Sequence, residues 1–89
     1  MGGRALLAFN VRMIRTRLGL SQERLSIDAD VARGYLSQLE REKVNPTLDV
    51  LERLARALEV PVGALLAEPE PGAVKPPPLA NGRKRGGRS

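Results

Sequence analysis

Apolar residues recur at helical spacing up to about residue 67. The spacing predicts a first helix over residues 4–18, on which four residues share the inner face: Leu7, Val11, Ile14 and Leu18. Gly19 should end this helix in the left-handed conformation, which glycine adopts without steric cost. No segment shows the sustained apolar–polar alternation of a half-buried strand, so we expect an all-α fold.

Two short helices are predicted next. Ser21 is a typical N-cap for a helix over residues 22–28. A further helix is expected over residues 32–41. The residues expected to face inward are Leu25, Ala29, Val31, Leu36 and Leu39.

The connection between these helices is short: Ala29, Asp30 and Val31. Two helices joined by so few residues form a helix-turn-helix, whose second helix can enter the major groove of DNA. Ser26 is small, as the close crossing of the two helices requires. Asp30 occupies the turn position that needs a positive φ, where glycine is usual and aspartate is tolerated.

Two more helices complete the predicted domain. Thr47 is expected to cap a fourth helix, and Asp49 lies favourably near the positive end of that helix. Its inner face should hold Leu48, Leu51, Leu54, Ala55 and Leu58. Pro61 is expected at the first position of a fifth helix. The apolar residues of this last helix are Val62, Leu65 and Leu66. We therefore expect five helices within a domain over residues 1–67.

The composition changes after that domain. Residues 68–89 hold five of the seven prolines and are rich in glycine and arginine, so this tail is predicted to be disordered. The net charge of +5 is uneven. Residues 1–67 have ten basic and eight acidic residues, and the tail has five and two. The tail has three candidate roles: phosphate contacts, binding of a protein partner, or solubility alone.

Missing residue types narrow the possible functions. The chain contains no cysteine and no histidine, which removes disulfides, thiolate metal sites and the commonest general base. We therefore expect no enzyme, no metal and no cofactor. No apolar run is long enough to span a membrane, and the stretch 5–9 is too short for a signal peptide, so we expect a cytoplasmic protein.

The sequence resembles the phage-repressor-like helix-turn-helix proteins of the Cro/CI type, also called the xenobiotic-response-element family. The matching segments are RTRLGLSQERL (15–25), YLSQLERE (35–42) and NPTLDVLERLARALEVPVGALL (45–66). The resemblance covers about residues 5–67. It implies a five-helix, lambda-repressor-like domain that binds double-stranded DNA and regulates transcription, with repression favoured. The recognition helix, residues 32–41, would then lie in the major groove.

The resemblance also implies roles for single residues. Gln22 matches a residue that bonds a DNA phosphate and braces the recognition helix, and Arg15 and Glu40 match a structural ion pair. Tyr35 would lie near the groove wall. The outward face of the recognition helix, where base edges are read, holds Arg33, Gly34, Ser37 and Gln38. The following loop would contact the DNA backbone through Arg41, Lys43 and Asn45.

Three residues depart from the family pattern. Ala32 stands where serine or threonine often caps the recognition helix. Gly34 lies inside that helix, which costs about 1 kcal/mol relative to alanine and removes one reading side chain. Glu42 replaces a common glycine and adds negative charge near the DNA.

A homodimer is expected, with one recognition helix on each half of a symmetric site. The predicted dimer surface consists of Val60, Pro61, Val62, Leu65 and Leu66. Three alternative functions stay open. The chain could be a DNA-binding antitoxin whose tail holds a partner, a restriction–modification controller protein, or a helix-turn-helix module that docks proteins without DNA.

Overall fold

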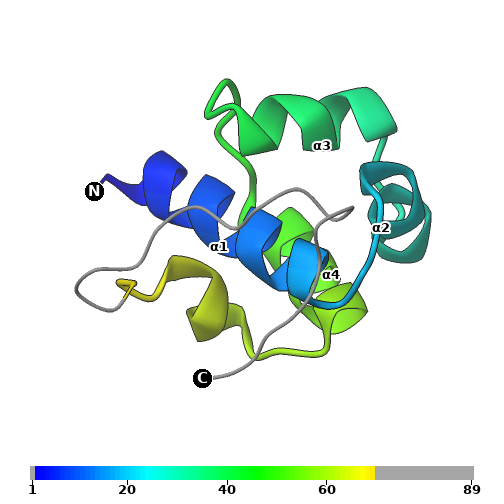
Figure 1. Ribbon diagram of the computed structural model, residues 1–89. Helices are drawn as coiled ribbons and strands as arrows, with labels where there is room; N and C mark the ends of the chain where they lie inside the picture. The colour runs from blue at the N-terminus through cyan, green and yellow to red at the C-terminus, as the bar shows by residue number, and fades with distance from the viewer. Residues whose placement is uncertain (1, 70–89) are drawn as a thin grey trace.

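The computed structural model describes residues 2–69, and the remainder of the predicted tail lies outside the described residues. Its helices are α1 (Gly3–Arg17), α2 (Gln22–Ala29), α3 (Arg33–Glu40), α4 (Leu48–Leu58) and the 3₁₀ helix η1 (Val62–Leu66). Residues 2–69 contain no strand, which confirms the all-α class. Figure 1 shows α1 running through the middle of the molecule, with α3 along one edge.

The predicted helix ends are confirmed where local side-chain chemistry sets them. Gly19 has a φ of 76°, the left-handed conformation expected after α1. The Ser21 hydroxyl accepts a hydrogen bond from the backbone N–H of Arg24 at 2.9 Å. The Thr47 hydroxyl accepts one from the N–H of Val50 at 3.2 Å. Both hydroxyls satisfy a donor that a helix start would leave unpaired.

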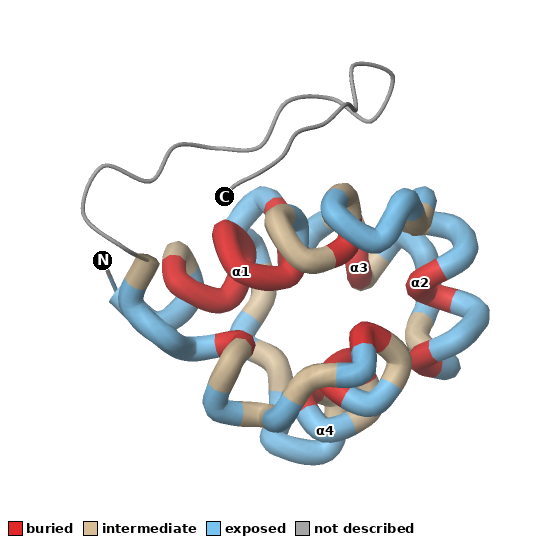
Figure 2. The backbone as a smooth tube through the Cα atoms, turned by 60° about the horizontal axis from the view of Figure 1, so that its bottom comes forward, coloured by how far each residue is buried: buried red, intermediate tan, exposed pale blue. Residues whose placement is uncertain are grey.

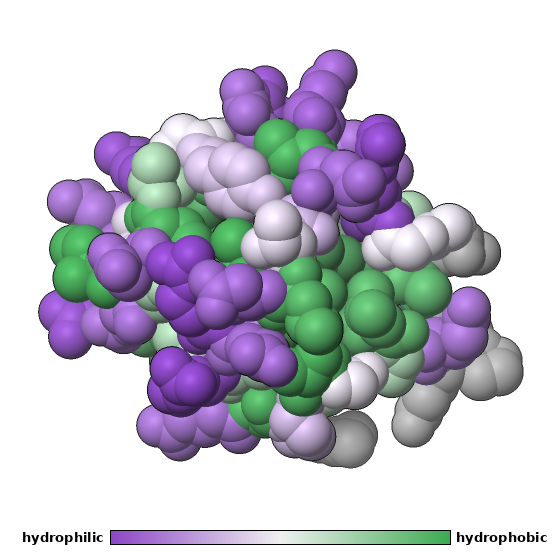
Figure 3. All heavy atoms as spheres, turned by 180° about the vertical axis from the view of Figure 1, so that it is seen from behind, coloured by the Kyte–Doolittle hydropathy of each residue, from purple (hydrophilic) through white to green (hydrophobic). Residues whose placement is uncertain are grey.

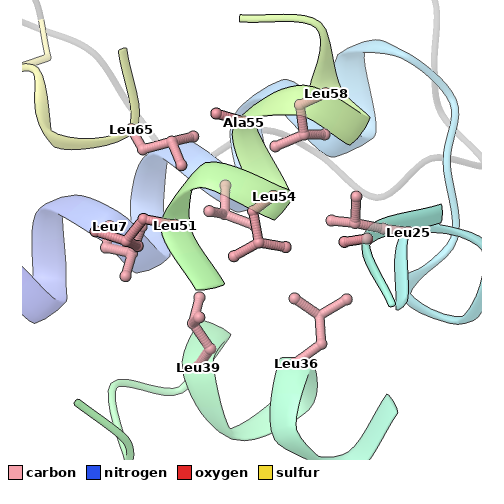
Figure 4. Packing of buried hydrophobic residues seen from close by; sticks show 11 residues of the cluster. Leu7, Leu25, Leu36, Leu39, Leu51, Leu54, Ala55, Leu58 and Leu65 are labelled. Atoms are coloured by element: carbon pink, nitrogen blue, oxygen red, sulfur yellow. The ribbon is translucent and has the colours of Figure 1, made fainter. Parts of the chain in front are cut away.

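The core lies where the inner faces of the helices meet. Its largest fully buried side chains are Val11, Leu25, Leu36, Leu54, Leu58 and Leu65. In Figure 4, Leu36 points from α3 toward Leu54 of α4, while Leu25 approaches from α2. Burying each such leucine contributes about 1.5–3 kcal/mol to folding. The core therefore fixes α2 against α4, and α3 against α1 and α2.

Two inner-face predictions are wrong, and both residues stand at a helix end. Leu18 is 50% exposed and Leu48 is 64% exposed. Leu18 follows the last residue of α1, where the chain turns away at Gly19. Leu48 is the first residue of α4. Helical spacing places both residues on the side of the helix that faces the core. The packed region, however, does not extend to the ends of these helices.

The predicted fifth helix is a 3₁₀ helix, so residues 2–69 contain four α-helices. Pro61 precedes η1 as its N-cap, with an extended ψ of 153°, and its carbonyl accepts from the N–H of Ala64 at 2.9 Å. Segments of 3₁₀ helix are short, and the five residues of η1 are long for this winding. Leu65 is fully buried in the core. Its assignment to a dimer surface is therefore wrong, because it has no surface to offer.

A side-chain bridge attaches this last turn to the first helix. The buried Asn10 of α1 donates from its amide nitrogen to the carbonyls of Leu65 at 3.0 Å and Ala67 at 2.9 Å. The two carbonyls lie at the end of η1, where no further helical turn would pair them. Asn10 thus fixes the end of the described chain on α1. None of the helices in residues 2–69 is both long and apolar enough for a membrane span.

Candidate nucleic-acid interface

The turn between α2 and α3 has the geometry that the sequence predicts. Asp30 ends α2 with φ 58° and ψ 51°, in the left-handed region. The N–H of Val31 donates to the carbonyl of Ser26 at 3.0 Å. Ser26 is buried, and its hydroxyl donates to the carbonyl of Glu23 at 2.7 Å. These contacts turn the chain within a few residues and bring α3 across α2.

One face of α3 packs on the core and the other faces solvent. Leu36, Leu39 and Glu40 are buried. Arg33, Gly34 and Gln38 are exposed, and Ser37 and Tyr35 are half-buried. Tyr35 packs against the core, so its ring contributes to the fold as well as to the surface. Figure 2 shows the buried parts of α2 and α3 turned inward and the exposed parts on the outer side.

The loop after α3 presents polar side chains beside that outer face. Arg41, Lys43 and Asn45 are all exposed. Glu42 takes the position expected of a glycine, with a φ of 64°. The N–H groups of Glu42 and Lys43 donate back to α3, to the carbonyls of Leu39 at 3.0 Å and Gln38 at 2.8 Å. The loop is thus held close to the end of α3.

A buried ion pair fixes the C-terminal end of α3. Nε of Arg15 lies 2.7 Å from Oε2 of Glu40, and a second guanidinium nitrogen donates to Oε1 at 3.0 Å. Arg15 also donates to the carbonyl of Leu20 at 2.8 Å. Two parallel charge-assisted bonds set both distance and orientation. The pair therefore attaches α3 to α1, as its match to a structural ion pair implies.

Gln22 adds α2 to this network. Its Nε2 donates to Oε1 of Glu40 at 3.0 Å, so the first residue of α2 contacts the last residue of α3. This bond supports the bracing role expected of Gln22. Its contact with a DNA phosphate stays a prediction. The Glu40 carboxylate accepts three side-chain bonds in all, from Arg15 and Gln22.

Sequence reasoning missed Arg53 of α4. Its NH1 donates to the backbone carbonyl of Asp30 at 2.8 Å, and its NH2 lies 2.9 Å from Oδ2 of Asp49. Asp49 and Arg53 are four residues apart in α4, a spacing that predicts their ion pair from the sequence alone. The contact with Asp30 joins residues 23 positions apart and has no signal in the local pattern.

The positive charges of this region favour a polyanion. Arg33, Arg41 and Lys43 are exposed on α3 and its loop, and Glu42 is the acidic residue among them. The carboxylate of Glu40 is buried and paired with Arg15, so it does not oppose an anion at the surface. A helix with basic and amide side chains on its outer face, followed by a basic loop, has the chemistry to contact base edges and phosphates together.

The family model described as helix-turn-helix matches residues 11–65. A hypothetical transcription factor of Neisseria meningitidis serogroup B is 40% identical over 67 residues, which are 75% of this chain and 63% of that protein. The immunity repressor of Bacillus phage phi105 is 38% identical over 58 residues, 65% of this chain and 40% of the repressor. The chain thus spans less than two thirds of the length of either relative.

Solved structures agree with these matches. The crystal structure of the hypothetical transcription factor NHTF from Neisseria has a TM-score of 0.75 at 39% identity, covering 78% of this chain and 79% of that one. The restriction–modification controller protein C.AhdI from Aeromonas hydrophila has a TM-score of 0.68 at 32% identity, covering 70% of this chain and 94% of the controller. The chain belongs to the helix-turn-helix family and is a phage-repressor-like member of it.

Proposed function

We propose that the protein binds duplex DNA sequence-specifically and regulates transcription, with α3 in the major groove. The outer face of α3 carries this proposal, because it presents Arg33 and Gln38 to solvent while its inner face is fixed by the core and by Glu40. Relatives described as a transcription factor and an immunity repressor support the same function. Repression is the favoured mode, because one of these relatives is described as an immunity repressor.

The side chains of α3 suit direct reading of bases. Arginine can donate two hydrogen bonds to guanine, and glutamine can exchange two with adenine. Arg33 and Gln38 are the candidates for these contacts, with Ser37 beside them. Gly34 has no side chain, and nothing within 4 Å would meet a β-carbon there, so the groove can approach the backbone at this point.

Phosphate contacts would fix the position of α3 in the groove. Arg41, Lys43 and Asn45 are exposed in the loop, and Tyr35 of α3 and Gln22 of α2 are half-buried. Such contacts supply most of the affinity but read no sequence. Residues 70–89 lie outside the described residues, and further phosphate contacts or a protein partner are their proposed roles.

A homodimer would place two copies of α3 on a symmetric site. The proposed surface keeps Val60, Pro61, Val62 and Leu66, of which Leu66 is 42% exposed. Hydrophobic side chains gather among polar ones on the face of the molecule shown in Figure 3. Two recognition helices in successive major grooves would read half-sites about one helical turn apart, roughly 34–36 Å.

Selection from a pool of random duplex DNA tests the function. The full-length protein should enrich an inverted repeat over successive rounds. Arg33→Ala should then lose discrimination at one position of each half-site, by about 1–3 kcal/mol. Arg12→Ala, which removes an exposed arginine from α1, is the matched control and should keep the same motif. If the bound DNA stays random, or no DNA is retained, sequence-specific regulation is excluded.

A restriction–modification controller protein is the second candidate. The observation that favours it is the match to the controller protein C.AhdI, 94% of which is covered at a TM-score of 0.68. Genes for an endonuclease and a methyltransferase beside the coding sequence would support this candidate. Neither the antitoxin nor the docking module gains a specific observation from the structure, and both stay predictions.

A further inference from the structure

The helix-turn-helix is held from outside by one side chain of α4. Arg53 bonds the backbone carbonyl of Asp30 at 2.8 Å and the carboxylate of Asp49 at 2.9 Å. Its NH1 also lies 3.9 Å from the Asp30 carboxylate. The guanidinium therefore connects α4 to the residue at the centre of the turn. Its Nε is buried and has no hydrogen-bond partner among the described residues, so part of the group is enclosed by protein.

The turn has two unfavourable features that the bond from Arg53 to Asp30 offsets. Asp30 adopts the left-handed conformation, which is unfavourable for a residue with a β-carbon. In addition, α2 ends with Asp28 and Asp30 close to its negative end, and its last turn contains no basic residue. Arg53 supplies from another helix both a donor for an end carbonyl and a positive charge beside it.

The N-terminal end of α3 depends on this turn. At its other end, α3 is fixed by the bonds of Glu40 to Arg15 and Gln22. At its start, Ala32 has no side-chain oxygen that could cap the helix. The Asp30 dihedral angles therefore set where α3 begins, and Arg33 is its first residue. A shift of the turn would move Arg33 more than any other residue of the outer face.

We infer that Arg53 is a positioning residue for DNA recognition. Its guanidinium holds Asp30 in the left-handed conformation and thereby sets the position of Arg33 in the groove. The inference deepens the proposed function, and its DNA part rests on that function. The effect on the turn does not depend on DNA and can be measured separately.

Amide hydrogen exchange in the full chain, followed by NMR, tests the turn. Arg53→Ala should raise the exchange rates of the Asp30 and Val31 amides about tenfold relative to amides in α1, because only the turn is loosened. Arg56→Ala removes an exposed arginine from the same helix and should leave the ratio unchanged. Arg53→Lys, which keeps the charge but cannot bond two acceptors in a fork, should give an intermediate ratio and serves if the alanine variant fails to fold.

A rescue experiment separates positioning from general stability. Glycine adopts the left-handed conformation without strain, so Asp30→Gly combined with Arg53→Ala should restore slow exchange at Val31. Equal acceleration at all amides in Arg53→Ala, or no recovery in the double variant, would overturn the inference.

The DNA arm uses the duplex selected by the wild-type protein and a scrambled duplex of the same length. At temperatures where every variant is folded, Arg53→Ala should reduce the ratio of the two affinities about tenfold, the equivalent of one lost base contact. The Asp30→Gly/Arg53→Ala double variant should recover most of the wild-type affinity ratio. An unchanged ratio in Arg53→Ala would refute positioning. If the wild-type protein selects no duplex, the proposed function fails while the exchange experiment still decides the role of Arg53 at the turn.

Discussion

Glu40 is a buried residue that supports the exposed face of α3 from behind. Its side chain is only 2% exposed, yet it lies at the end of the helix that is proposed to read DNA. Three side-chain hydrogen bonds from Arg15 and Gln22 compensate the loss of water around its charge. The carboxylate is therefore part of the frame that keeps the exposed residues of α3 in place.

Removal of this carboxylate should be strongly destabilising. Glu40→Ala leaves the Arg15 guanidinium buried without its counter-charge, so the free energy of unfolding should fall by about 3–5 kcal/mol. Chemical denaturation followed by circular dichroism measures the change. Glu52→Ala, at an exposed site of α4, is the control and should change the value by about 0.5 kcal/mol or less.

A double variant checks the physical reason. When Arg15→Met is combined with Glu40→Leu, no buried charge is left unpaired, and the loss should be well below the sum of the two single losses. Additive losses would contradict the ion-pair account.

At the scale of elements, three acidic residues occupy positions that usually favour glycine. Asp30, Glu42 and Glu59 follow α2, α3 and α4 with φ of 58°, 64° and 60°. Each side chain places negative charge at the negative end of a helix dipole. The Asp30 carboxylate is exposed and lies 3.9 Å from the Arg53 guanidinium, and Glu42 lies on the proposed DNA side. Glu59 is exposed and lies at the far end of α4, so it isolates the effect of the backbone conformation.

Glu59→Gly should stabilise the protein. The substitution relieves left-handed strain of about 1–2 kcal/mol and adds freedom to the unfolded chain, so the net gain should be about 0.5–1 kcal/mol. Glu52→Gly, in the middle of the same helix, should instead lower the free energy of unfolding by about 0.5–1 kcal/mol. Urea denaturation of both variants measures the two values. If Glu59→Gly does not raise the free energy of unfolding, the Glu59 side chain must contribute a stabilising interaction of its own.

Helix ends were predictable from the sequence where a side chain or a glycine sets them. Ser21 and Thr47 act on their own neighbours in the chain, so local pattern is sufficient. Burial is not local in this sense. Leu18 and Leu48 continue apolar faces, but whether a residue is covered depends on which helix lies opposite it, and nothing lies close enough to bury these two.

At the scale of the whole molecule, the outer face of α3 followed from helical spacing and the family resemblance. The support behind that face was only partly predictable. The Arg15–Glu40 pair came from the resemblance, whereas the bond from Arg53 to Asp30 connects two helices and depends on their packing angle. Helix packing also explains the wrong prediction for Leu65. The sequence assigned this residue to a dimer surface, but packing buries it in the core.

Leu66 provides the test of the assembly. It remains 42% exposed beside the buried Leu65. Leu66→Arg should convert a dimer into a folded monomer, because a charge in an apolar contact would lose its water without gaining a partner. Analytical ultracentrifugation measures the mass, and affinity for the selected inverted repeat should fall with it. Leu48→Arg changes another exposed leucine and should leave the dimer intact. A dimer that survives Leu66→Arg would place the contact elsewhere.

The bridge from Asn10 to the carbonyls of Leu65 and Ala67 has a consequence for how the protein is made. These bonds join residues 55 and 57 positions apart, so α1 receives these partners only after η1 has left the ribosome. Until then α1 lacks η1, and the core lacks Leu65. A nascent chain that already contains α2 and α3 therefore has the proposed DNA-reading surface without its complete support. The proposed DNA binding should therefore arise only once residues 62–67 have emerged and packed on α1, as a cooperative step.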